Sequence, residues 1–431
     1  MTAEIAILNK NAVALAADSA VTLRQPGGPK IYNTANKLFM LSKHEPVGIM
    51  IFGDAEFMST PWESIIKVYR TKLGKTKFST LEEYAKAFLA FFETDNILFP
   101  ADLQALHFKW RIQRNLQQIQ NEIDSEVKKF IEDNSSIDGQ KTAEIVQRAI
   151  KLRFDTSQAS ANLSNFSDDE MVALANTYDS EIEEAINEIF QNLPIGEVRP
   201  QLKMMCAFFV GKNLDWANNS GVVIAGFGDN EIFPRLRCYT LGTVCHKKLK
   251  FFCNQQLGCD IGLSTNASIV PLAQDEMVRR FMQGIDPTYR GSVNDYLKAL
   301  LTELFPQRIS DAIAEKLSDE EKTSFGTKLR DSCSQLLQEF EAARNSYERT
   351  KFIDPIIDIV ADLPKDDLAA MAESLVNLTS FKRRITAEAE TVGGPIDVAV
   401  ISKGDGFIWI KRKHYFHRDL NPYFFANYYR E

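Results

Sequence analysis

The residues most able to do chemistry lie at the start of the chain. Thr2 follows Met1 directly, and aminopeptidases that remove an initiator methionine favour a small second residue. A threonine hydroxyl is a weak nucleophile that needs an adjacent base. A free terminal amine, with a pKa of about 8, can supply that base on the same residue. We therefore expect removal of Met1 to expose Thr2 as a nucleophile.

Two charged residues could assist such a nucleophile. An apolar segment after Thr2, a turn at Asn9–Asn11 and a second apolar segment predict a β-hairpin, which would return Asp18 to the neighbourhood of Thr2. Lys37 opens a further apolar segment. A lysine beside the terminal amine would lower the pKa of that amine, and a carboxylate would keep the lysine charged and oriented. Taken singly, Asp18 fits a turn residue and Lys37 a solvated strand residue, so it is their combination with Thr2 that predicts a site.

The elements that would position these residues change character along the chain. Strands are predicted, from short apolar segments bounded by turn residues, at 3–8, 12–17, 37–41, 47–52, 221–225, 232–241, 243–252, 396–402 and 407–411. Helices are predicted, from helical spacing of apolar residues and from the capping-box sequence at 79–83, at 56–73, 79–93, 103–132, 268–283, 292–304 and 367–383. Strand runs that alternate with helix runs predict an α+β protein with two antiparallel sheets and helices outside them.

The segments around the candidate residues resemble the start of proteasome β-type subunits and their bacterial relatives, which are N-terminal-nucleophile hydrolases. The matching stretches are Thr2-Ala3-Glu4-Ile5-Ala6-Ile7, Ala14-Leu15-Ala16-Ala17-Asp18-Ser19 and Asn36-Lys37-Leu38. The resemblance implies that Thr2, Asp18 and Lys37 form the catalytic centre. It also implies that Gly53, in Phe52-Gly53-Asp54-Ala55-Glu56, supplies the backbone N–H that stabilises an oxyanion. The resemblance implies no metal and no organic cofactor.

The same resemblance implies a four-layer αββα sandwich that carries two large helical insertions. The domain boundaries predicted on this basis are 2–95 for the first half of the core, 96–195 for a helical insertion, 196–289 for the second part of the core, 290–365 for a second insertion, 366–412 for the final core helix and hairpin, and 413–431 for an aromatic C-terminal tail.

Composition narrows the classes of partner. The formal net charge is −8, which disfavours a protein that binds nucleic acid or an anionic membrane. The six cysteines form no CxxC pair, so we expect no metal site and a reducing compartment. The N-terminus lacks the pattern of a signal peptide, and no run approaches the roughly 20 apolar residues that span a bilayer. We expect a soluble, cytoplasmic protein.

The function predicted from the sequence is hydrolysis of an amide bond in a peptide or protein substrate by Thr2. Two alternatives stay open. One is an amidase or acyltransferase that acts on a small molecule, since one nucleophile serves many substrates. The other is a catalytically silent assembly protein, which would keep Met1. The resemblance further implies a homo-oligomer, whereas the sequence does not identify an unfoldase partner.

Overall fold

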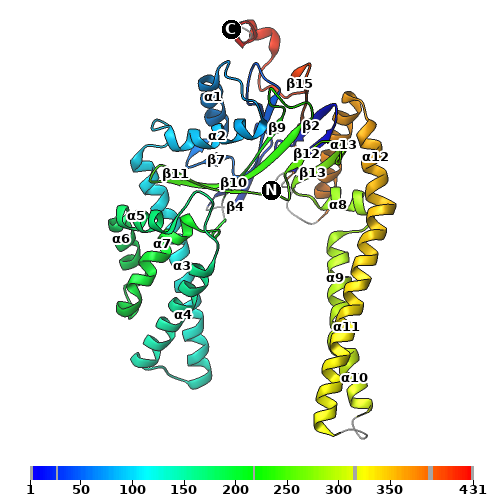
Figure 1. Ribbon diagram of the computed structural model, residues 1–431. Coiled ribbons are helices and arrows are strands. Elements are labelled where there is room, and N and C mark those ends of the chain that lie inside the picture. Colours follow the sequence, from blue (N-terminus) through cyan, green and yellow to red (C-terminus); the bar gives the residue numbers. More distant parts are fainter. Residues whose placement is uncertain (1–2, 26–27, 217–218, 314–317, 387–391, 429–431) are drawn as a thin grey trace. The chain divides into compact units, whose positions relative to one another are not determined.

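The computed structural model describes residues 3–25, 28–216, 219–313, 318–386 and 392–428. Two compact units make up the chain. The first contains residues 1–34, 261–400 and 408–431, and the second contains residues 35–260 and 401–407. Figure 1 labels their helices and strands.

A five-stranded sheet, most of which belongs to the first unit, has the strand order β13-β1-β2-β14-β15. Its strands are β1 (Ala3–Asn9), β2 (Ala12–Ala17), β13 (Ala267–Ala273), β14 (Asp397–Ser402) and β15 (Gly406–Lys411). Strand β1 pairs antiparallel with β2 and β13. The turn between β1 and β2 forms because the Asn9 Oδ1 accepts hydrogen bonds from the backbone N–H groups of Asn11 and Ala12.

Helix α13 (Lys365–Ile385) packs on β1 and β2, and α12 (Asp354–Asp362) packs on β13. The core between helices and sheet contains Ile5, Ile7, Leu375 and Val398, together with the small side chains of β2, which let α13 approach the sheet closely. The sequence predicts one helix over 268–283, and this prediction is wrong for its first part, which forms the strand β13. The helix found there, α8, covers only Glu276–Gln283.

A helical arm completes the first unit. It contains α9 (Pro287–Ala299), a π-helical turn at Leu300–Leu304, α10 (Phe305–Ala312), α11 (Asp319–Glu348) and a second π-helical turn at Arg349–Ile353, which leads into α12. Helix α11 lies alongside α9 and α10 (Figure 1). Arg290 of α9 binds Glu348 of α11 at 2.5 Å, which ties the two helices together. A small hairpin, β3 (Val21–Gln25) and β4 (Gly28–Tyr32), and the C-terminal elements Arg418–Leu420 and α14 (Pro422–Tyr428) also belong to this unit.

The second unit contains a six-stranded sheet with the order β11-β10-β9-β6-β5 and with β12 paired to β10. Its strands are β5 (Leu38–Met40), β6 (Val47–Gly53), β9 (Ser220–Gly226), β10 (Arg235–Cys245), β11 (Lys248–Cys253) and β12 (Cys259–Asp260). Helix α2 (Leu81–Thr94) packs on β9, β10 and β11 and begins with the predicted capping box of Thr80 and Glu83. Helix α1 (Trp62–Leu73) contributes to the same core. The sequence predicts a helix from residue 56, but 56–61 form a short hairpin, β7 (Glu56–Phe57) and β8 (Thr60–Pro61).

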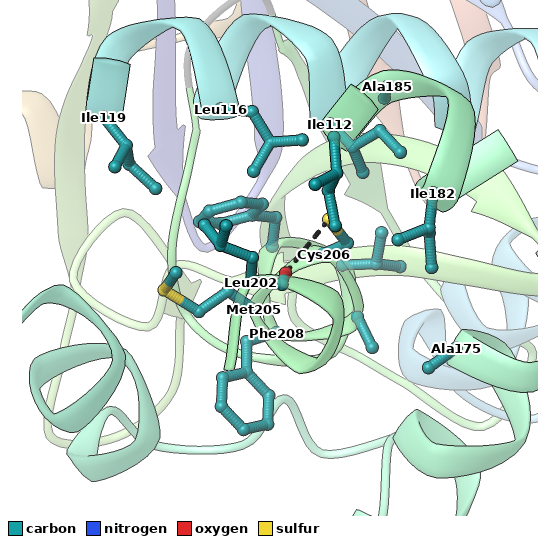
Figure 2. Packing of buried hydrophobic residues seen from close by; sticks show 14 of the residues in the cluster. Ile112, Leu116, Ile119, Ala175, Ile182, Ala185, Leu202, Met205, Cys206 and Phe208 are labelled. Atoms are coloured by element: carbon teal, nitrogen blue, oxygen red, sulfur yellow. Dashed lines mark hydrogen bonds between the residues drawn. The ribbon is translucent and has the colours of Figure 1, made fainter. Parts of the chain in front are cut away.

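A bundle of helices follows in the second unit: α3 (Ala101–Asn134), α4 (Gly139–Ala159), α5 (Asp168–Thr177), α6 (Asp179–Ile189), a 3₁₀ turn at Gly196–Val198 and α7 (Arg199–Gly211). Apolar residues of α3 at helical spacing, among them Ile112 and Leu116, meet Leu202 and Met205 of α7 in a buried core (Figure 2). Within this core the Cys206 Sγ donates to the Leu202 carbonyl at 3.3 Å, which satisfies the thiol inside its own helix.

The fold class is therefore α+β, with antiparallel strand pairing and many helices, as the sequence predicts at that level. The finer expectation of a four-layer αββα sandwich stays a prediction. Within the described part of the chain, no helix combines the length and the apolar character that crossing a membrane requires.

Candidate functional site

Asp18 has the best-defined environment of the residues that the sequence singled out. It directly follows β2 and is buried, with 1% of its surface exposed. Its Oδ1 accepts a hydrogen bond from the Ala3 N–H at 3.1 Å, and its Oδ2 accepts from the N–H groups of Ala20 (3.2 Å) and Gly393 (2.9 Å). The Asp18 N–H in turn donates to the Ala3 carbonyl at 3.1 Å. The carboxylate is thus fixed by three backbone donors at the start of β1.

The local sequence explains this placement. In the register of the first hairpin Glu4 lies opposite Ala17, so the next pair along, Ala3 and Asp18, must also lie side by side. The Gly393–Gly394 segment brings the third donor from the far end of the chain. Gly394 has a φ of +78°, and a Cβ there would lie 2.8 Å from the Asn33 Cβ, so only glycine fits. The contact between Asp18 and Gly393 is one that sequence reasoning missed, although the Gly-Gly pair was a signal for it.

Lys37 and Gly53 both belong to the second unit. Lys37 immediately precedes β5, has 5% of its surface exposed, and its carbonyl accepts the Ile51 N–H at 2.9 Å. Its burial excludes the solvated strand lysine that was the alternative. Gly53 ends β6 with a φ of +87°, and a Cβ at this position would lie 2.6 Å from the Asn219 carbonyl oxygen. The left-handed backbone and the close approach of Asn219 both require glycine here.

The predicted site residues therefore have different outcomes. The structure brings the Asp18 carboxylate to Ala3, the residue that follows Thr2. Thr2 itself lies outside the described residues. Asp18 belongs to the first unit, and Lys37 and Gly53 belong to the second, so their joint role stays a prediction. In the described ranges no group of three or more His, Cys, Asp or Glu side chains is arranged to hold a metal ion.

Comparisons with known proteins assign no family to this chain. A scan against protein-family models found no match, and a search of curated proteins found none either. Among solved structures, Anbu (ancestral beta-subunit) from Yersinia bercovieri matches over 98% of this chain and 90% of its own, with 11% sequence identity and a TM-score of 0.26. At that score the likeness carries no argument about fold or function.

These findings correct the resemblance drawn from the sequence. The assignment to the N-terminal-nucleophile hydrolases, as a relative of bacterial proteasome β-subunits, is wrong as a statement of family, because no family model matches and the structural likeness is this weak. The structure is an antiparallel, sheet-rich α+β fold and not a clear four-layer sandwich. The physical reason for the error is that the matching stretches form a hairpin of small residues with a tight turn. Small residues are needed in any hairpin that packs closely against a helix, so they do not identify one family.

Proposed function

We propose that this protein hydrolyses an amide bond with Thr2 as its nucleophile, once Met1 has been removed. The proposal rests on the geometry around Asp18. The observation that supports it is the 3.1 Å hydrogen bond from the Ala3 N–H to the buried Asp18 carboxylate, one residue beyond Thr2.

The buried carboxylate is a positioning device. Asp18 and Ala3 exchange two hydrogen bonds, one through the Asp18 side chain and one through its backbone. Donors on Ala20 and Gly393 hold the same carboxylate in place, so it cannot rotate away from Ala3 without losing them. Rigid support of this kind is what a reacting group needs in order to hold one attack geometry.

The proposed reaction uses only groups of Thr2, the substrate and water. The Thr2 Oγ attacks the carbonyl carbon of the amide while its proton passes to the terminal amine. The amine then delivers that proton to the leaving nitrogen as the C–N bond breaks, which leaves an ester on Oγ. Water attacks the ester and gives a proton to the amine, and the C–Oγ bond breaks with return of that proton to Oγ.

Other parts of the hypothesis stay predictions from the sequence. They are the tuning of the amine by Lys37, the oxyanion donor at Gly53, a peptide or protein as substrate, a homo-oligomer and a cytoplasmic location. Lys37→Met tests the first of these roles, with the rate of the same reaction as the readout, whereas the role of Gly53 concerns a backbone N–H that a side-chain substitution does not remove.

The test is the intact mass of the purified protein before and after treatment with a β-lactone, which acylates activated hydroxyl groups. We expect the loss of Met1 and one adduct that maps to Thr2 and is absent in Thr2→Ala. In Asp18→Asn the adduct should form more slowly, because the substitution removes the charge and places an amide in a pocket lined by N–H donors.

Asp397→Asn is the matched control for Asp18→Asn. Asp397 is another buried carboxylate of the same sheet, with 2% of its surface exposed, and it accepts a backbone N–H from Lys413 at 2.8 Å. If both variants slow the reaction equally, the effect of Asp18 is one of stability alone. Retention of Met1 with no adduct would overturn the hydrolase proposal and favour the silent assembly protein.

A further inference from the structure

Ser59 and His107 form a hydrogen-bonded pair that the proposed function does not use. The Ser59 Oγ lies 3.2 Å from the His107 Nε2. Both residues belong to the second unit, and they lie 48 positions apart in the sequence. A serine hydroxyl within hydrogen-bond reach of an imidazole nitrogen is the arrangement in which a histidine can take the proton of an attacking serine.

The backbone at Ser59 is held in an unfavourable conformation. Met58 and Ser59 are the two loop residues of the β7–β8 hairpin, with Phe57 paired to Thr60. Their φ angles are +49° and +61°. A two-residue hairpin loop of this type usually contains Asn or Gly, because other residues strain there. Strain of this kind persists only where the surroundings enforce it, and it is concentrated at functional sites.

The surroundings of the turn do enforce it. Met58 is buried, and its Sδ accepts a hydrogen bond from the Val244 N–H at 3.1 Å. The Phe57 ring is buried and packs in a T-shaped arrangement with the rings of Phe92 and Phe99. With the residues on its N-terminal side anchored in the core, the turn presents Ser59 as an exposed residue.

His107 is positioned by a helix whose neighbouring residues are anchored in the protein interior. It lies in α3 between Gln104 and Phe108, both of which are buried. Partial burial lowers the pKa of His107 below its usual 6.5, and the nearby positive charge of Arg111 lowers it further. The imidazole is therefore mostly neutral at pH 7 and able to accept a proton.

Apolar surface lies next to the pair. The ring of Trp110 meets the ring of His107 edge-on with 4.9 Å between centroids, and 51% of the Trp110 surface is exposed. Leu106, directly before His107 in the chain, has 43% of its surface exposed. An aromatic ring with one free side can hold the apolar part of a small substrate by stacking.

We propose that Ser59 and His107 are a second acyl-transfer site, which hydrolyses small carboxylic esters with an aromatic or apolar group. Among the described residues no carboxylate hydrogen-bonds to the His107 imidazole, so the base acts without a third residue. Esters whose alcohol departs readily are the substrates that such a pair can cleave, whereas amides need stronger assistance.

The step balances with the ester and water alone. The Ser59 Oγ attacks the carbonyl carbon while its proton moves to the His107 Nε2. The bond to the leaving oxygen breaks with its electron pair, and that oxygen takes the proton from Nε2 to depart as the free alcohol or phenol. Water then attacks the acyl-serine with transfer of a proton to Nε2, and the acid leaves as Oγ regains that proton.

The experiment uses the full chain, an alkyl fluorophosphonate as covalent probe and p-nitrophenyl acetate as substrate. The probe forms an Oγ–P bond and expels fluoride, so the modified residue can be mapped by mass spectrometry. In the Thr2→Ala variant, which lacks the other proposed nucleophile, we expect one adduct on Ser59 and release of p-nitrophenol, both lost when Ser59→Ala or Ser59→Gly is added. In His107→Gln both rates should fall about 100-fold, the typical contribution of a general base.

Three control variants separate the chemistry of this pair from misfolding, from nonspecific serine labelling and from reaction at Thr2. Ser59→Gly relaxes the left-handed turn, so the variant should fold at least as well as the wild type while losing the nucleophile. Ser125→Ala removes another exposed serine of α3, whose Oγ donates to the Asn121 carbonyl, and should change nothing. Thr2→Ala should keep the Ser59 adduct, so that the two proposed sites succeed or fail separately.

Three results would overturn the proposal: no adduct, adducts only on residues other than Ser59, or rates in His107→Gln equal to those of the protein with His107.

Discussion

Replacement of Arg111 by methionine should destabilise the second unit more than any exposed ion pair could. The Arg111 Nη1 donates to the Asp215 carboxylate at 2.8 Å and to the Asp215 carbonyl at 3.0 Å. Its Nη2 donates to the Asn219 Oδ1 at 3.2 Å and to the Gly242 carbonyl at 3.1 Å. The two side chains of the ion pair are 8% and 7% exposed.

The expected magnitude follows from what the variant leaves behind. Removal of one partner of a buried ion pair typically costs about 3–5 kcal/mol, because the other charge stays buried. Asp215 would keep Arg114, whose side chain is 38% exposed, and a hydrogen bond of 2.9 Å from the Asn115 Nδ2. We therefore expect Arg111→Met to lower the free energy of unfolding by about 3 kcal/mol, the lower end of that range.

The dependence on pH provides a second signature. Burial alone would raise the pKa of Asp215, but Arg111, then Asn115, Arg114 and Lys250, outweigh burial and lower it. A carboxyl group whose pKa is lower in the folded protein adds stability that is present above its unfolded pKa of about 3.9 and is lost as the pH falls through the folded pKa. The difference between wild type and Arg111→Met should therefore shrink as the pH falls below about 4.

The assay is urea-induced unfolding followed by tryptophan fluorescence. Three of the four tryptophans, Trp62, Trp110 and Trp216, belong to the second unit, so the signal reports mainly on that unit. Arg148→Met is the control, because Arg148 of α4 pairs with Glu126 of α3 at the protein surface. This variant should lower the free energy of unfolding by at most about 1 kcal/mol. If Arg111→Met were no less stable than this control, the buried hydrogen bonds and ion pair of Arg111 would not stabilise the second unit as expected.

The remaining predictions concern positions where the structure makes a particular demand. Gly53→Ala should lower the free energy of unfolding by about 1–3 kcal/mol, because alanine would have to adopt a left-handed φ with its Cβ 2.6 Å from a backbone oxygen. Its control is Gly139→Ala, where a Cβ meets nothing within 4 Å, and this variant should be neutral or stabilising in the same urea titration. Asn9→Ala should lower the melting temperature of the first unit, because the Asn9 side chain makes two hydrogen bonds within its turn and two to carbonyls at the end of α12. Ile112→Ala should lower the free energy of unfolding by about 2–5 kcal/mol, because it leaves a cavity in the core of Figure 2. Leu152→Ala, at a position that is 67% exposed, should lower it by under about 0.5 kcal/mol. Equal losses in the two variants would show that this core is not tightly packed.

Local chemistry made several elements predictable. The capping box of Thr80 and Glu83 starts α2, and the apolar spacing in 103–132 marks nearly all of α3. The first hairpin was readable because Asn9 supplies its own turn acceptor. Each of these signals acts between residues only a few positions apart, so it survives in the sequence alone.

Elsewhere local signals were misleading, and tertiary contacts decided the outcome. The sequence predicts the turn between β10 and β11 near 242, but the structure places it at His246–Lys247, two non-glycine residues with positive φ. There the Lys247 N–H donates to the Gln104 side chain and the His246 N–H to the Tyr178 hydroxyl, both of which belong to the helical bundle. No turn signal in the strand sequence indicates partners that lie so far away in the chain.

The same division applies to the candidate sites. By itself the sequence determined which residue types were available and that a hairpin would carry Asp18 back to the start of β1. Only the tertiary structure decided that Gly393 completes the carboxylate's hydrogen bonds, that Lys37 is buried, and that Ser59 meets His107. The physical reason is that hydrogen bonds within a turn depend on adjacent residues, whereas burial and side-chain pairing depend on how distant segments pack.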